Sequence, residues 1–411
     1  MSDPQYDLVV FGATSFVGSI LTRYLAATFG TDGRQLRWAV AGRSPEKLAA
    51  LREALSEGGQ TLPMVVADAG DEQALQRLCA DSRVVVSTVG PYALYGEPLV
   101  RACVESGTDY CDLTGEIQWI RRMLRRYEQR AGETGARIVH CCGFDSIPSD
   151  LGVYFLQQQA RARFGEPATR VKMRVRAIRG GMSGGTVASL VNVIQEARRD
   201  RQLRRELADP YSLCPEGHGQ GVRQPRIRFA GQDPDFGAWV APFIMAPVNT
   251  RVVLRSNALA GAAGVAGLQY DEALMTGRGV RGGLTAAVTA LATGGFAMAA
   301  ALAPLRRLLQ RFVLPGPGEG PSPEAQERGF YDLRFHGRTA DGRELRVQVT
   351  GDRDPGYGST GKMLGQAAAC LALDMDRDSV PGGFWTPSTI FGDRLLHRLE
   401  AHAGLAFRIQ E

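Results

Sequence analysis

Several residue types that mark common kinds of functional site are scarce in this chain of 411 residues. The five histidines are scattered, no two cysteines form a Cys-x-x-Cys pair, and no ligand spacing predicts a metal site. Three of the 48 basic residues are lysine, and the net charge of +5 is too small an excess to favour nucleic acid as a partner. The apolar run at 8–11 is too short for a secretory signal, so we expect a cytoplasmic protein with free thiols.

Glycine, by contrast, is abundant, with 50 residues in the chain. Gly12 and Gly18 stand between an apolar strand at 7–11 and a helix that follows it. A turn without side chains lets a pyrophosphate lie on the N-terminus of such a helix. Residues 1–149 alternate six apolar strands with helices, which predicts an α/β, Rossmann-type doubly wound parallel sheet that binds a dinucleotide.

The ends of four predicted strands provide candidate cofactor residues. The second strand ends in Arg43 and Ser44, where a NAD site would place an acidic side chain. Because a guanidinium and a hydroxyl suit a 2′-phosphate, we predict NADP(H). Ser15 occupies a position where glycine is usual, which restricts the approach to the backbone there. The predicted cofactor residues are Gly12, Ala13, Thr14, Ser15, Phe16, Val17, Gly18, Gly42, Arg43, Ser44, Asp68, Thr88, Val89, Gly90 and Pro91.

The alternation stops after residue 149, and a second, α+β domain is expected over 150–375. Two alternating runs flank Asp341-Gly342, which is a strong hairpin signal. Residues 209–250 are rich in proline, glycine and aromatic side chains and predict irregular structure. The glycines and proline of 382–387 predict a turn.

Residues 282–305 carry no charged side chain, and a helix of this length could cross ~30 Å of hydrocarbon. Their many alanines, glycines and threonines weaken that interpretation. Three interpretations stay open: a helix in the core or in a dimer interface, a helix that contacts a membrane or an acyl chain, and a membrane span. Arg306, Arg307 and Arg311 would suit anionic head groups, so 282–311 is a candidate for peripheral membrane contact.

Eight runs in the chain carry a resemblance to a known family. They are Gly12–Gly18, Ala41–Ser44, Thr88–Leu99, Tyr110–Glu116, Gly143–Asp150, Gly180–Thr186, Gly316–Pro323 and Gly383–Pro387. These runs resemble the saccharopine dehydrogenase-like oxidoreductases, and among them the trans-acting enoyl reductases of bacterial lipid and glycolipid biosynthesis. The resemblance implies NADP(H)-linked chemistry, a Rossmann domain, a second domain whose sheet helps to form a homodimer, and a return of 376–411 to the first domain.

Enoyl reduction needs a hydride, which the cofactor supplies, and a proton from a group near the nicotinamide. The best-placed candidate proton donors are Tyr92 and Tyr95, after the fourth strand. Tyr110, Asp112 and Glu116 after the fifth strand, and Asp145 and Ser146 after the sixth, are further candidates, although Asp145 could instead cap the next helix. We expect an NADP(H)-dependent enoyl reductase that acts on a lipid-like or carrier-bound acyl substrate. The alternatives are a saccharopine-type amino-acid dehydrogenase and a non-catalytic, membrane-associated NADP-binding protein.

Two further motifs look catalytic but have simpler explanations. His140 stands beside Cys141, and neighbours in a strand point to opposite faces, so we expect His140 to pack in the interior and to form no Cys–His dyad. Residues Gly356–Met363 nearly match a P-loop, but Met363 stands where serine or threonine must bind Mg²⁺. We expect these glycines to shape a turn that faces the substrate.

Overall fold

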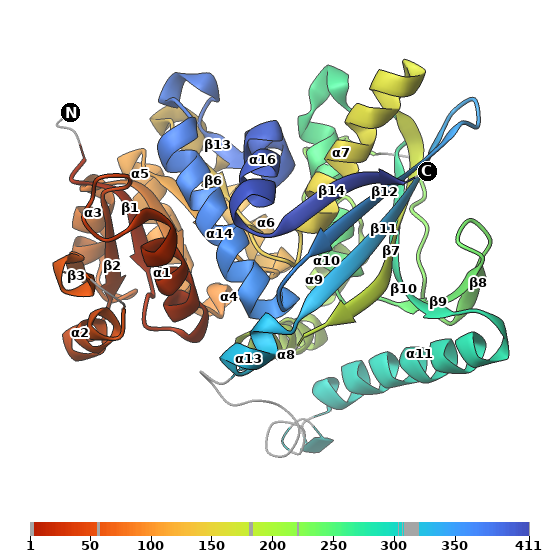
Figure 1. Cartoon of the computed structure of the whole chain (residues 1–411), viewed down its shortest axis with the longest axis horizontal. Helices are drawn as coiled ribbons and strands as arrows, with labels where there is room; N and C mark the ends of the chain where they lie inside the picture. Colours follow the sequence, from red (N-terminus) through yellow and green to blue (C-terminus); the bar gives the residue numbers. More distant parts are fainter. Residues whose placement is uncertain are drawn as a thin grey trace. The chain divides into compact units, whose positions relative to one another are not determined.

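The computed structural model describes residues 4–55, 58–180, 184–219, 222–302, 304–305, 307 and 320–410. They form two compact units (Figure 1). Among these residues, the first unit takes 4–144, Gly320 and 356–403, and the second takes the rest, from Asp145 onward and including 404–410. The units therefore divide five residues earlier than the predicted boundary, and 356–375 belongs to the first unit.

Parallel strands alternating with helices build the first unit. Its strands are β1 (Tyr6–Phe11), β2 (Trp38–Gly42), β3 (Met64–Val66), β4 (Ser82–Ser87), β5 (Asp109–Asp112), β6 (Arg137–Val139) and β13 (Gly383–Trp385). Its helices are α1 (Phe16–Phe29), α2 (Pro45–Glu53), α3 (Glu72–Ala80), α4 (Tyr92–Tyr95), α5 (Glu97–Ser106), α6 (Ile117–Thr134), α14 (Thr360–Ala369), α15 (Pro387–Phe391) and α16 (Asp393–His402). The strand order is β13-β6-β5-β4-β1-β2-β3, with every neighbouring pair parallel. The predicted doubly wound sheet is confirmed.

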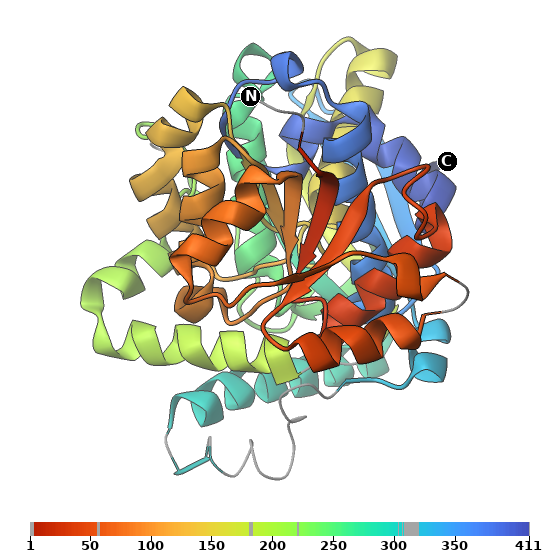
Figure 2. The same ribbon diagram turned by 90° about the vertical axis from the view of Figure 1, so that its left-hand side faces the viewer.

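Strand β1 lies in the interior of this sheet, between β2 and β4. Leu8, Val9 and Val10 are fully buried, as expected for a parallel strand with helices on both faces (Figure 2). The winding of the sheet reverses between β1 and β4. In open α/β sheets ligands bind beyond the carboxyl ends of the strands at this reversal.

The last part of the chain divides between the two sheets. Strand β13 extends the first sheet beside β6, where sequence reasoning predicted a turn, because Phe384 pairs with Ile138 and so gains ladder partners that no local pattern shows. Strand β14 (Leu405–Gln410) instead pairs with β12 of the second sheet. The return expected for 376–411 therefore does not include the last strand.

The second unit is a mixed sheet with helices. Its strands are β7 (Ala168–Arg179), β8 (Gly231–Asp233), β9 (Ala238–Pro242), β10 (Gln269–Gly277), β11 (Phe330–Thr339), β12 (Glu344–Gly351) and β14. Its helices are α7 (Ile147–Phe164), α8 (Gly184–Arg199), α9 (Arg201–Ala208), α10 (Ala246–Leu259), α11 (Gly279–Ala301) and α13 (Pro323–Glu327). The order is β14-β12-β11-β7-β10-β9-β8, in which β7 and β10 are parallel and the other pairs antiparallel. This architecture is the α+β unit that the sequence predicted.

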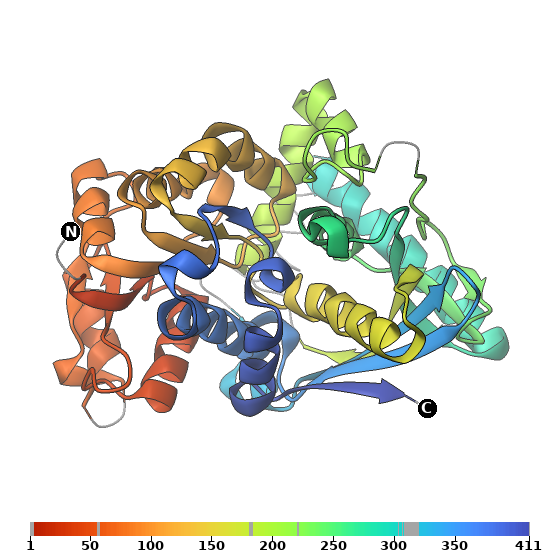
Figure 3. The same ribbon diagram turned by 90° about the horizontal axis from the view of Figure 1, so that it is seen from above.

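Pairing between strands also explains which predictions for the second unit are confirmed and which are wrong. The hairpin at Asp341-Gly342 is confirmed by the antiparallel pairing of β11 with β12. The stretch 209–250 was expected to be irregular but contains β8, β9 and the start of α10. Strand β9 forms because it pairs with β10, which is distant in the sequence. Leu345, Val347 and Val349 of β12 are buried in alternation, and Figure 3 shows α7 lying along these strands.

Helix α11 is, among the described residues, the one helix long and apolar enough to cross a membrane. In its most apolar window 12% of the residues are buried, so the interpretation of 282–305 as a helix in the core of the single chain is wrong. Part of that segment, and Arg306 and Arg311 after it, lie outside the described residues.

A buried ion pair between β5 and β6 also bonds the segment of the chain that leads to β13. Arg137 and Asp109 are 1% exposed or less, and the Arg137 guanidinium donates to both carboxylate oxygens of Asp109. Arg137 also donates to the carbonyl of Asp376 at 3.0 Å. The pair thereby fixes β5 against β6 and positions the segment that leads to β13.

Replacing Asp109 with alanine is expected to lower the free energy of unfolding by about 3–5 kcal/mol, because Arg137 would remain buried without a counter-charge. Denaturant unfolding followed by circular dichroism measures the change. Glu105→Ala is the control, since it breaks the exposed pair with Arg130 and should leave the transition nearly unchanged. Equal effects of the two substitutions would contradict this account of Arg137.

Candidate cofactor and active site

The turn after β1 has room for glycine alone at two positions. Gly12 has a φ of +81°, and a Cβ added to it would lie 2.5 Å from Val89 Cγ2. A Cβ on Gly18 would lie 2.2 Å from the carbonyl oxygen of Gly12. These contacts hold the turn close to the start of α1, where free backbone N–H groups favour an anion.

Ser15 is the N-cap residue of α1. Its Oγ accepts a hydrogen bond of 2.9 Å from the backbone N–H of Gly18. It also shares a hydrogen bond of 2.9 Å with Thr88 Oγ1. Sequence reasoning treated Ser15 as an obstacle, although a serine directly before the first helical residue is the usual N-cap signal.

Thr88 connects the end of β4 to the turn after β1. Its hydroxyl donates to the carbonyl of Gly12 at 2.9 Å, so the Ser15 hydroxyl is the donor in the bond between the two side chains. The other predicted residues follow along the chain: Ala13, Thr14, Phe16 and Val17 lie in the turn and the first turn of α1, and Val89, Gly90 and Pro91 lead from Thr88 into α4. The structure thus brings the two strand ends at the reversal point together.

The turns after β2 and β3 lie at the same edge of the sheet. Gly42 is the last residue of β2, and Arg43 after it is exposed, with no ion-pair partner among the described residues. The hydroxyl of Ser44 accepts from the backbone N–H of Lys47 at 3.2 Å and caps α2. Asp68 is exposed after β3, and its Oδ1 accepts from the N–H of Gly70 at 2.8 Å. Arg43 is therefore a free cation at the position that receives a 2′-phosphate in such sheets.

Two of the three candidate tyrosines are buried and engaged. The Tyr92 hydroxyl donates to the carbonyl of Ser87 at 2.9 Å, and that of Tyr110 donates to Asp112 Oδ2 at 3.0 Å. Burial raises the pKa of both phenols well above its ordinary value. The Tyr95 side chain, in contrast, is 50% exposed, and the described residues offer its hydroxyl no hydrogen-bond partner.

A buried carboxylate holds the segment that carries Tyr92 and Tyr95. The side chain of Glu116 accepts from the backbone N–H groups of Tyr92 at 2.8 Å and Ala93 at 3.0 Å. These groups are the first donors of α4, which has no side-chain cap of its own. Glu116 therefore sets the position of the short helix that presents Tyr95.

The Asp112 carboxylate also holds several groups in place. Its contact with His140 was not predicted from the sequence. His140 Nδ1 lies 2.7 Å from Asp112 Oδ2, and the backbone N–H groups of Thr114 and Cys141 bond Asp112 Oδ1 at 3.0 and 3.3 Å. His140 is buried one residue beyond β6 and packs against aromatic rings. The sequence contains a signal for this contact, because Asp112 ends β5, His140 directly follows β6, and these two strands are neighbours.

Asp145 begins the second unit and does not cap α7. The N-cap position is Ser146, whose hydroxyl donates to Asn249 Oδ1 at 3.2 Å. Asp145 is half-buried, and burial raises the pKa of its carboxyl to about 6. A carboxyl with this pKa exchanges its proton close to neutral pH.

The stretch that nearly matches a P-loop has a packing role. A Cβ on Gly361 would lie 2.9 Å from Ile20, and one on Gly365 would lie 2.9 Å from Tyr24. Gly361 of this stretch and Gly365 beyond it thereby let α14 lie closely on α1.

Changing Arg43 to glutamate is expected to weaken NADPH binding roughly 10- to 100-fold, the worth of a charge-assisted hydrogen bond. NADH lacks the 2′-phosphate, so its binding should change far less; calorimetric titration of both cofactors measures the difference. Arg77→Glu is the control, because this exposed residue in the last turn of α3 lies away from the carboxyl ends of the strands. An equal loss for both cofactors would contradict the assignment.

Comparison with known proteins identifies the family. Residues 8–139 match the family described as saccharopine dehydrogenase NADP binding domain. A relative from Mycobacterium tuberculosis is 43% identical over 415 residues, which cover 98% of this chain and 97% of the relative. Proteins named trans-acting enoyl reductase from Mycobacterium bovis and Mycobacterium ulcerans are each 38% identical over 97% and 96% of this chain and 96% of their own length.

A solved structure shares the fold. It is the apo saccharopine dehydrogenase (L-Glu forming) from Saccharomyces cerevisiae, with a TM-score of 0.55 and 13% identity over 98% of this chain and 99% of that chain. The matched domain contains the turn after β1, Arg43 and Thr88, so the first unit is an NADP-binding domain. The chain belongs to the saccharopine dehydrogenase-like oxidoreductases, in the family of the trans-acting enoyl reductases.

Proposed function

We propose that this protein uses NADPH to reduce the carbon–carbon double bond of an enoyl group on a lipid-like or carrier-bound acyl substrate, in lipid or glycolipid biosynthesis. The proposal rests on one observation: the NADP-binding edge belongs to a chain that aligns over nearly its whole length with proteins named trans-acting enoyl reductase. All seven cysteines are free, which favours a reducing cytoplasm as the place of the reaction.

The chain's own residues bind and orient the reactants. Bound NADPH supplies the hydride. The turn at Gly12, held by Ser15 and Thr88, would receive the pyrophosphate, and Arg43 would hold the 2′-phosphate. The hydrogen bonds of Ser15 and Thr88 fix this turn within the chain, and a turn fixed in this way loses less conformational freedom when the cofactor binds.

Tyr95 is the proton donor that the geometry of the first unit supports best. Reduction places a proton on the carbon next to the thioester or acyl carbonyl, so the donor needs a hydroxyl that faces the substrate. Tyr92 and Tyr110 commit their hydroxyl protons to Ser87 and Asp112. We therefore assign these two buried tyrosines a positioning role, while Tyr95 remains accessible.

Asp145 is a second candidate donor on a separate observation, its pKa of about 6. The acid form that donates a proton predominates below this pKa and is lost above it. The two candidates therefore predict different pH dependences.

The substitution Tyr95→Phe is expected to lower turnover by about 10²- to 10⁴-fold with NADPH affinity unchanged, because only the proton donor is lost. NADPH oxidation with a panel of enoyl thioesters measures the change, and reduction of NADP⁺ by saccharopine is followed as a separate arm. Tyr6→Phe at the amino end of β1 is the matched control and should keep full turnover.

Full turnover of Tyr95→Phe would exclude Tyr95. Reduction of NADP⁺ by saccharopine, with no oxidation of NADPH by enoyl substrates, would exclude the enoyl reductase proposal and favour an amino-acid dehydrogenase.

If Asp145 donates the proton, turnover falls about tenfold per pH unit as the pH rises above about 6, because the acid form disappears. With Tyr95 as donor, no such decline is expected in the neutral range. Rates of wild type and Asp145→Asn across this range separate the candidates: a decline that Asp145→Asn abolishes would overturn the assignment to Tyr95.

A further inference from the structure

Helix α11 packs with its small residues inward. A Cβ on Gly283 would lie 3.1 Å from the Trp239 ring of β9, and one on Gly282 would lie 2.5 Å from the backbone of Gly277. Ala286 is fully buried. Glycine and alanine thus let the helix lie close against β9 and β10, and Figure 2 shows α8 running beside it.

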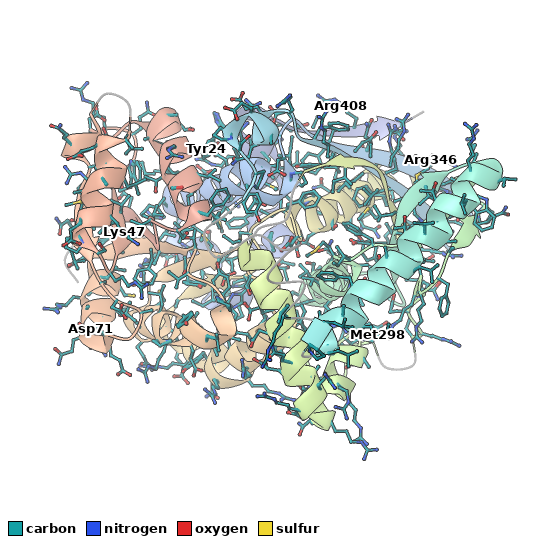
Figure 4. All side chains as sticks on the ribbon, turned by 90° about the horizontal axis from the view of Figure 1, so that it is seen from below. Tyr24, Lys47, Asp71, Met298, Arg346 and Arg408 are labelled. Atoms are coloured by element: carbon teal, nitrogen blue, oxygen red, sulfur yellow. The ribbon has the colours of Figure 1, made fainter. Side chains whose placement is uncertain are left out.

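Most of the large apolar residues of α11 point outward. Val280 is 90% exposed, Leu284 68% and Leu291 75%. The full exposed stripe is Val280, Leu284, Val288, Leu291, Met298 and Leu302. Its spacings of four, four, three, seven and four residues keep it on one side of the helix, and Met298 is labelled on α11 in Figure 4. A soluble helix normally turns its large apolar residues inward, so this arrangement implies that something apolar covers the stripe.

Positive charge borders the stripe, and the sequence segment itself carries no compensating acid. No aspartate or glutamate occurs between Glu272 and Glu319, a range that contains five arginines. Arg278 and Arg281 are exposed at the N-terminal end of α11, where the helix dipole disfavours cations, and Arg307 is exposed beyond its other end. Helix stability therefore does not explain their position, whereas an anionic surface would.

We propose that the stripe and its flanking arginines dock on the surface of an anionic lipid membrane, with α11 lying in the plane of the head groups. The inner side of the helix is occupied by β9 and β10, which argues against a span. A second copy of the chain is a poorer occupant, because a two-fold contact would face arginines with arginines and the segment offers no acid to pair with them. The proposal is independent of the enoyl reductase chemistry.

Vesicle co-sedimentation of the full-length protein tests the proposal. The vesicles consist of phosphatidylglycerol and phosphatidylcholine in equal parts, or of phosphatidylcholine alone. Wild type should bind the anionic vesicles preferentially and release with salt. The double substitution Leu284→Ser/Leu291→Ser should weaken binding at least about tenfold. Arg278→Gln/Arg281→Gln should reduce both affinity and salt dependence.

Leu373→Ser is the matched control, since it removes an exposed leucine of the first unit and should leave vesicle binding unchanged. NADPH affinity and circular dichroism check that every variant is folded. Failure of wild type to bind the anionic vesicles, or equal binding by the leucine variant, would overturn the proposal. So would light scattering that shows a dimeric wild type and a monomeric leucine variant, because the stripe would then be a subunit interface.

Discussion

The hydrogen bond from the Thr88 hydroxyl to the carbonyl of Gly12 is the contact on which the cofactor site depends. It joins β4 to the turn after β1 at the place where the winding of the sheet reverses. The same hydroxyl accepts from Ser15, whose side chain also caps α1. One small network therefore holds the end of β4, the turn after β1 and the start of α1 together, and it tolerates no side chain at Gly12.

Buried carboxylates organise the other half of this edge. Glu116 holds the start of α4 through two backbone N–H groups, and Asp112 gathers the ends of β5 and β6. Acidic residues at the carboxyl ends of parallel strands invite assignment as acids or bases. Here their oxygens are used to satisfy backbone donors that would otherwise be buried without partners. One consequence is that Tyr95 stands exposed at the end of a rigidly held helix.

The second unit follows a different rule. Its sheet buries alternate residues under helices, as Leu345 and Val347 illustrate, yet α11 exposes most of its large apolar residues and buries small ones, Gly282, Ala286 and Ala300. The composition of α11 explains how one helix can pack closely on the sheet and also expose large apolar residues. Small residues permit close packing on β9, and the leucines and valines that remain are free to contact an apolar partner. A chain with a well-packed core can therefore carry an apolar surface as a separate feature.

By itself the sequence determined what depends on neighbours along the chain: the strand–helix alternation, the glycine turn, Arg43 after β2 and the hairpin at Asp341-Gly342. These features follow from local periodicity and backbone geometry, and they sufficed for the fold class and for NADP. Only the tertiary structure decided which tyrosine is accessible, that Asp112 meets His140, that 383–385 forms a strand, and which side of α11 is buried. Each of these depends on partners distant in the sequence, which periodicity does not identify.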